Sequence, residues 1–118
     1  MALVLCTGVD PVLMKTRQLI LEAAGHTVIP AVDEREVKAA CGQHKFDVAV
    51  IGQSIAAKMK AHVLGIVQEH CPAARVLELY AAYEGRALAN ADAWLEMPAG
   101  TPDELVRAVN SLVPDQKK

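Results

Sequence analysis

Aromatic residues and basic clusters are scarce in this chain. Only 3% of its 118 residues are aromatic, and the formal net charge at pH 7 is −2, with charges of both signs mixed along the sequence. The rings that could stack on bases are Phe46, Tyr80, Tyr83 and Trp94. A protein that binds nucleic acid directly normally presents a basic patch together with such rings. We therefore expect no nucleic acid among its direct partners.

Long apolar runs are also missing. The first apolar stretch, residues 2–6, has no basic leader and is far shorter than a signal sequence or a membrane span. No later run approaches spanning length. We therefore expect no membrane partner and a cytoplasmic location.

Cysteine is equally sparse, since Cys6, Cys41 and Cys71 are the only three. An odd number of cysteines in a chain of this size favours reduced thiols over a disulfide framework. With 53% hydrophobic residues the chain can bury one core without covalent cross-links. We assign residues 1–113 to a single domain and residues 114–118 to a polar tail.

Short apolar, β-branched runs alternate with helical patterns along the chain. Strands are expected at residues 2–6, 27–31, 47–51, 75–80 and 93–97. Helices are expected after Asp10-Pro11, after Asp33, over residues 55–70, around residues 84–89 and after Thr101-Pro102. Asp and Thr are preferred caps, and proline is favoured at the first helical position. This alternation predicts an α/β fold with one doubly wound, five-stranded parallel sheet in three layers.

The apolar residues of the first helix recur with helical spacing. They are Val12, Leu13, Thr16, Leu19, Ile20 and Ala23. Such a stripe normally faces the core, so we expect these residues to be buried. Gly25 is expected to end the helix in a left-handed conformation.

Three segments resemble one known family. They are LEAAGHTV at residues 21–28, DVAVIG at residues 47–52, and ADAWLEMP with TPDELVRAVNSLV at residues 91–98 and 101–113. Together they resemble a bacterial response-regulator receiver domain, and the resemblance covers nearly the whole chain. It implies a flavodoxin-like fold with strand order 2-1-3-4-5 and a role in two-component signal transduction.

The resemblance also implies where phosphotransfer chemistry would take place. A receiver accepts a phosphoryl group on an aspartate at the end of its third strand, and an acidic pair after the first strand helps to hold Mg²⁺. A hydroxyl at the end of the fourth strand and a lysine near the end of the fifth bind the phosphoryl oxygens. The acceptor position here is Gly52, the acidic pair is Gly8 and Val9, the hydroxyl position is Tyr80 and the lysine position is Met97. The carboxylate nucleophile and the charged oxygen ligands are therefore missing.

These departures indicate a degenerate receiver, or pseudo-receiver, which is not an enzyme and uses no cofactor. Receivers of this kind signal through the hydroxyl position and through an aromatic residue just before the lysine position. Tyr80 and Trp94 occupy these two positions, with Tyr83 nearby. We predict that the three rings form an interaction face for a signalling protein or for a second copy of the chain. Ordinary aromatic packing is the competing interpretation.

Two alternatives concern the same end of the sheet. Asp10 could retain part of a Mg²⁺ site, although helix capping before Pro11 also explains it. Small residues at Gly8 and Gly52, beside Met97, could leave an emptied pocket for a small apolar or anionic ligand.

Cys6 supports a different hypothesis. The tripeptide CTG at residues 6–8 faintly resembles the phosphocysteine loop of sugar-phosphotransferase B subunits, which would make the chain a phosphoryl carrier. The alternative is a buried and inert Cys6 at the end of an apolar strand. His26 is interpreted as a cation at the C-terminus of the first helix.

The remaining candidates are pairs of polar residues. Cys41, His44, His70 and Cys71 are donors that zinc prefers, but separate surface histidines and helix-end cysteines account for them equally. Glu78 and Glu96 lie in neighbouring predicted strands and could form a carboxylate pair with one raised pKa. The interpretation we favour places both toward the solvated edge of the sheet.

Overall fold

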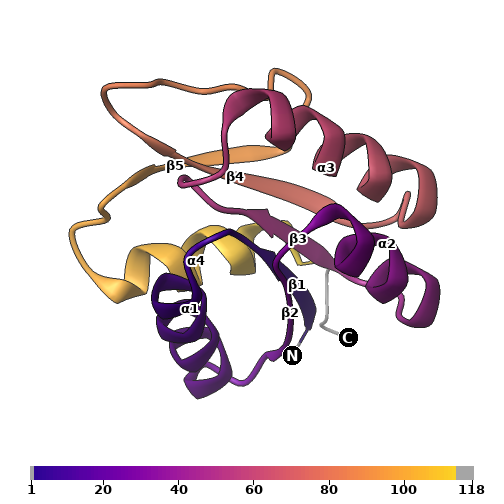
Figure 1. Ribbon diagram of the computed structural model, residues 1–118. Coiled ribbons are helices and arrows are strands. Elements are labelled where there is room, and N and C mark those ends of the chain that lie inside the picture. Colours follow the sequence, from indigo (N-terminus) through magenta and orange to yellow (C-terminus); the bar gives the residue numbers. More distant parts are fainter. Residues whose placement is uncertain (1, 114–118) are drawn as a thin grey trace.

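A computed structural model describes residues 2–113. Its strands are β1 (Leu3–Thr7), β2 (Thr27–Ala31), β3 (Val48–Ile51), β4 (Arg75–Ala81) and β5 (Ala93–Met97). They form one parallel sheet in the order β2-β1-β3-β4-β5, as expected (Figure 1). The central strand β3 is buried along its whole length, because helices cover both faces of the sheet.

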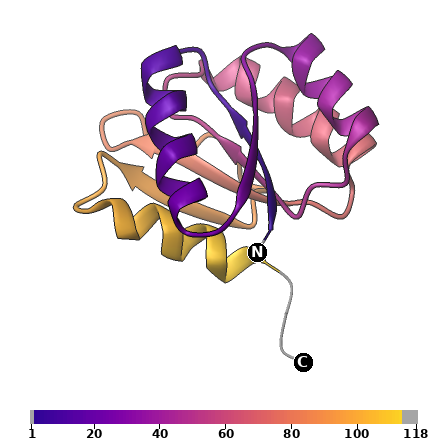
Figure 2. The ribbon, with the colours of Figure 1, turned by 90° about the horizontal axis from the view of Figure 1, so that it is seen from below.

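Four helices flank the sheet: α1 (Pro11–Ala23), α2 (Glu34–Gln43), α3 (Ala57–His70) and α4 (Pro102–Leu112). Figure 2 shows α1 and α4 on one face and α2 and α3 on the other. Each face has its own apolar core, one built around Leu5 and Ile51 and the other around Val4 and Leu77. The predicted three-layer, flavodoxin-like architecture is therefore confirmed. Among the described residues, no helix has the length and apolar character needed to cross a bilayer.

The helix starts follow from local side-chain chemistry. Asp10 Oδ1 accepts hydrogen bonds from the backbone N–H groups of Val12 and Leu13, at 3.0 and 3.3 Å, which caps α1. Asp33 Oδ1 accepts the Glu36 N–H at 2.8 Å in the same way. Gly25 follows α1 with a φ of 98°, a conformation that glycine adopts without strain.

The buried face of α1 differs from the expectation. Met14, Arg17 and Leu21 point inward, whereas Val12 is 73% exposed and Leu19 is 54% exposed. The helix has two rows of residues with helical spacing. Apolar periodicity selects the exposed row, because the row that is buried contains an arginine. The predicted burial is therefore wrong for the exposed members of the predicted stripe, which are Val12, Thr16, Leu19 and Ala23.

The connection between β4 and β5 is the second difference. The helix expected around residues 84–89 is absent, and residues 82–92 form an irregular connection with turns at residues 82–84 and 89–90. Ala81 O accepts the N–H groups of Glu84 and Gly85 at 3.0 and 2.9 Å, and Gly85 has a φ of 74°. The alanine-rich pattern is too short to form a helix against these competing contacts. The described part of the chain therefore has four helices, one fewer than expected.

Candidate functional site

The carboxyl ends of β1 and β3 bring two glycines together at the C-terminal edge of the sheet. Gly52 N donates a hydrogen bond to Thr7 O at 3.1 Å, in continuation of the ladder between the two strands. A Cβ atom at Gly52 would lie 3.6 Å from Gly8 Cα and only 2.9 Å from Thr7 O. The backbone itself therefore leaves little space for any side chain at position 52.

The guanidinium group of Arg17 occupies the space beside Gly52. Arg17 is only 4% exposed, and its Nη1 lies 3.2 Å from the position that a Gly52 Cβ would take. Its Nη2 donates a hydrogen bond to Gln53 Oε1. Burial lowers the pKa of Arg17, whereas the nearby Cys6 and Asp10 act in the opposite direction. A buried cation from α1 thus lies beside the joined ends of β1 and β3.

The crevice around this cation is filled. Met14 Cγ lies 3.1 Å from the position of a Gly8 Cβ, and the crevice between Gly8, Gly52 and Arg17 has about 0 Å³ of free volume. The predicted emptied pocket is therefore absent between Gly8 and Gly52, because the buried Met14 and Arg17 side chains of α1 fill that space.

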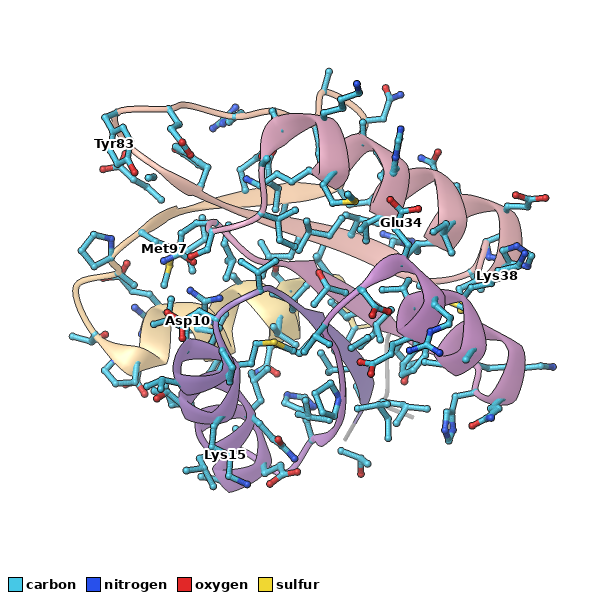
Figure 3. All side chains as sticks on the ribbon, in the orientation of Figure 1. Asp10, Lys15, Glu34, Lys38, Tyr83 and Met97 are labelled. Carbon is cyan, nitrogen blue, oxygen red and sulfur yellow. The ribbon has the colours of Figure 1, made fainter. Side chains whose placement is uncertain are left out.

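A groove lies on the other side of Gln53, with a volume of ≈ 710 Å³. Its lining comprises residues 53–56, residues 81–84, Met97 and Pro98. Figure 3 shows Asp10, Met97 and Tyr83 on this side of the molecule. The free space at this end of the sheet therefore lies in this groove and in a second one of ≈ 260 Å³ that borders Arg17, Gln53 and Met97.

The predicted aromatic face centres on an arginine that no pattern in the sequence reveals. The Arg86 guanidinium lies 4.6 Å from the ring centroid of Trp94 and 5.8 Å from that of Tyr80. Trp94 Nε1 donates a hydrogen bond to Leu88 O at 3.0 Å, which ties the ring to the β4–β5 connection. Tyr83 is 89% exposed. The structure thus joins Tyr80 and Trp94 through Arg86 and leaves Tyr83 in solvent.

Beneath this face lies a buried ion pair. Lys60 Nζ of α3 lies 2.8 Å from Glu78 Oε2 of β4 and donates a second hydrogen bond to Leu79 O at 2.8 Å. The Glu78 carboxylate also accepts the N–H groups of Ala87 and Leu88, at 2.8 and 2.9 Å. Burial raises the pKa of Glu78, but the hydrogen bonds from Lys60, Ala87 and Leu88 and the charge of Lys60 outweigh it, so the pKa lies below its ordinary value.

The predictions for Glu78 and Glu96 need correction. Glu78 is fully buried, so its predicted place at the solvated edge is wrong, whereas Glu96 is exposed. The two do not pair, since Glu78 is in register with Trp94 and Glu96 with Tyr80. Lys60 of α3 is the counter-ion of Glu78. The sequence of the strand alone could not have revealed this partner, because it comes from a different element.

No model of a known protein family matches the sequence, and no curated protein matches it either. Solved structures match closely in shape. A CheY-like response regulator receiver domain protein from Methanospirillum hungatei has a TM-score of 0.78 at 18% identity, over 94% of this chain and 92% of its own. Chemotaxis protein CheY4 of Vibrio cholerae has a TM-score of 0.79 at 23% identity, over 96% and 99% of the two chains. Response regulator TrrA of Thermotoga maritima, in complex with Mg²⁺ and BeF, has a TM-score of 0.80 at 18% identity, over 96% and 100%.

The chain has the fold of CheY-like receiver domains. The receiver fold would place a Mg²⁺ ion beside the ends of β1 and β3, and the residues present there do not suit it. Gly8, Val9 and Gly52 carry no side-chain oxygen, and the Arg17 cation occupies the adjoining space. Asp10 Oδ1 already caps α1. Within residues 2–113, no three His, Cys, Asp or Glu side chains are grouped so as to hold a metal ion.

The other end of this receiver fold contains the four proposed zinc donors. Cys41, His44, His70 and Cys71 line a cavity of ≈ 440 Å³ beside the C-termini of α2 and α3. Cys41 and Cys71 lie together, but in residues 2–113 no third donor joins them, since His44 packs against the ring of Phe46 and His70 Nε2 lies 3.8 Å from Glu69 Oε1. Burial, with the hydrogen bond and charge of Cys71, raises the pKa of the Cys41 thiol above its ordinary value. This arrangement favours separate residues over a zinc site.

Cys6 and His26 both belong to the interior. Cys6 is fully buried, and burial raises the pKa of its thiol from 9.0 to about 11 although the Arg17 charge lowers it. His26 Nδ1 accepts the Ala2 N–H at 3.1 Å, and its Nε2 lies 2.7 Å from Asn110 Oδ1. A ring nitrogen that accepts a backbone N–H is unprotonated, so the interpretation of His26 as a helix-end cation is wrong.

Proposed function

We propose that this chain is a pseudo-receiver: a non-enzymatic signalling module of the two-component type that binds another protein without being phosphorylated. The observation that carries the proposal is the buried Arg17 guanidinium beside Gly52. A phosphoryl acceptor needs a carboxylate at that position and an accessible divalent ion next to it. Here a side chain with a permanent positive charge takes up the space, and a Cβ at position 52 would lie only 2.9 Å from Thr7 O.

The other positions of the phosphotransfer site support the same conclusion. Met97 replaces the lysine and Tyr80 replaces the small hydroxyl residue, and the Tyr80 ring lies near Arg86. Arg86 and the Trp94–Leu88 hydrogen bond hold this face in one arrangement. A receiver normally signals by changing that arrangement, so a fixed one suits constitutive protein binding. We place the protein-binding surface on Tyr80, Trp94 and Tyr83, with Arg86 between the first two.

The phosphoryl-carrier alternative receives little support. A nucleophilic cysteine must be accessible and must form its thiolate near neutral pH. Cys6 is fully buried in β1, and its pKa of about 11 keeps the thiol protonated.

Intact mass measurement after incubation with acetyl phosphate and Mg²⁺ tests the proposal. We expect no added phosphoryl mass, while a receiver that retains its acceptor aspartate, treated in parallel, gains it. A labile phosphoryl group on the folded chain would overturn the proposal. A C6A variant then distinguishes carriage on Cys6 from carriage on a carboxylate.

A further inference from the structure

The two edge strands of the sheet differ in their capacity to pair with another strand. At one edge, β2 contains Pro30, which has no N–H group to donate. At the other edge, β5 contains no proline, and β4 is its only neighbouring strand in the described part of the chain. Within residues 2–113, no backbone hydrogen bond from a loop or helix reaches the outer side of β5. An exposed edge of this kind is a template for strand addition.

The same edge carries two opposite charges. Arg86 lies over the Trp94 ring, and Glu96 projects from the same face of β5 because it is two residues farther along the strand. Both side chains are exposed. Neither belongs to an ion pair among the residues that the structure describes.

We propose that β5 pairs antiparallel with β5 of a second copy of this chain, with Leu95 on the two-fold axis. In that register Trp94 stands opposite the partner's Glu96, and Ala93 stands opposite the partner's Met97. A two-fold axis repeats each contact, so Arg86 of each copy meets the partner's Glu96. The sheet becomes continuous across the dimer, and the unpaired backbone groups of both edges bond to each other.

This inference rests on the proposed function in taking the β5 side as the binding surface, and it goes beyond it by naming the partner. A self-complementary arrangement needs opposite charges on the two sides of the axis, which Arg86 and Glu96 supply. The missing helix between β4 and β5 contributes as well, because the irregular connection of residues 82–92 replaces it beside the edge.

Charge reversal with rescue tests the dimer. Analytical ultracentrifugation of the full chain over a range of concentrations gives the dimer dissociation constant. We expect E96R and R86E each to raise it about tenfold or more, because each brings like charges together at both symmetric contacts. The double variant R86E/E96R restores opposite charges and is expected to return the constant to within about threefold of the original. The matched control E69R makes the same charge change at an exposed position of α3 and is expected to leave the dimer dissociation constant unchanged.

Three results would overturn the inference: a chain that is monomeric at all concentrations, a dimer that E96R leaves unchanged, or single variants that the double variant does not rescue. None of these affects the acetyl phosphate experiment. Conversely, a phosphorylated chain with the expected pattern of dissociation constants would reject the proposed function and retain the β5 dimer.

Discussion

Lys60 Nζ and Glu78 Oε2 are 2.8 Å apart, and the two side chains are only 3% and 0% exposed. The pair joins α3 to β4. Through the N–H groups of Ala87 and Leu88, it also holds the connection that leads to β5. A buried carboxylate that accepts the N–H groups of Ala87 and Leu88 favours the observed backbone there over a helix, in which those N–H groups would bond to backbone carbonyls. The aromatic face at Trp94 is therefore supported from inside the protein.

Removing one partner of this pair should be costly. Lys60→Met leaves the Glu78 carboxylate buried without its cation, so we expect the free energy of unfolding to fall by about 3–5 kcal/mol. K60M/E78Q removes the stranded charge and is expected to lose less than the sum of the two single changes. Urea denaturation of all three variants measures the coupling. Additive losses of unfolding free energy would contradict the coupling between Lys60 and Glu78. If K60M does not fold, the test is whether K60M/E78Q does.

Acid should weaken the protein through the same carboxylate. The folded pKa of Glu78 lies below its ordinary value of 4.5, so its contribution to stability is present above about pH 4.5 and is lost as the pH falls through the folded value. E78Q is expected to flatten this part of the pH profile of the unfolding free energy. The exposed Glu69 of α3 provides the control, since E69Q should leave the profile unchanged. Equal profiles for E78Q and the original chain would contradict the prediction.

Two glycines should respond in opposite directions to alanine. Gly52→Ala places a Cβ 2.9 Å from Thr7 O and 3.2 Å from Arg17 Nη1, so we expect a loss of about 1–3 kcal/mol. Gly65, in the middle of α3, has no atom within 4 Å of the place that an added Cβ would take, so Gly65→Ala should gain about 0.5–1 kcal/mol through helix propensity. Thermal and urea unfolding compare the two. Tolerance of Gly52→Ala would show that the crevice is looser than the structure indicates.

Arg17 should stabilise the fold without hiding a latent metal site. Arg17→Met is expected to cost about 1–3 kcal/mol, since the buried stem packs in the crevice and the guanidinium bonds Gln53. Arg35→Met, on the exposed face of α2, should stay within about 0.5 kcal/mol of the original. Melting of R17M with and without Mg²⁺ checks the metal. A higher melting temperature with Mg²⁺ would mean that Arg17 alone excludes the ion.

Alkali should destabilise the protein through Cys6. Its folded pKa of about 11 lies above the ordinary 9.0, so its contribution is fully present below about pH 9 and is lost as the pH rises toward 11. Cys6→Ala is expected to reduce this decline in the unfolding free energy, and the part that remains is assigned to Cys41, whose pKa is also raised. Rapid labelling of Cys6 by a thiol reagent in the native protein at pH 7 would contradict its burial.

The order of elements was predictable because the signals are local. Asp10-Pro11 and Asp33 cap helices with their own side chains, and Gly25 ends α1 by its backbone freedom. The two wrong predictions also have physical causes. The buried stripe of α1 contains Arg17, which apolar periodicity discards, and the expected helix at residues 84–89 gave way to the irregular connection beside Glu78.

Only part of the candidate site could likewise be predicted from the sequence. That Gly8, Val9, Gly52 and Met97 bear no carboxylate or ammonium group can be read from the chain. The side chains found there instead cannot be read from the chain. Arg17 and its partner Gln53 are 36 residues apart, and Lys60 and its partner Glu78 are 18 apart. Only the packing of α1 and α3 against the sheet brings these side chains together.

The amino-acid sequence by itself determined the succession of strands and helices and the loss of the acidic residues, since both depend on residue type and short-range spacing. The tertiary structure alone decided that a buried guanidinium fills the crevice and that a buried ion pair holds the β4–β5 connection. Both depend on the burial of charged groups, which happens only when distant segments pack and supply the hydrogen bonds that those groups lose from water.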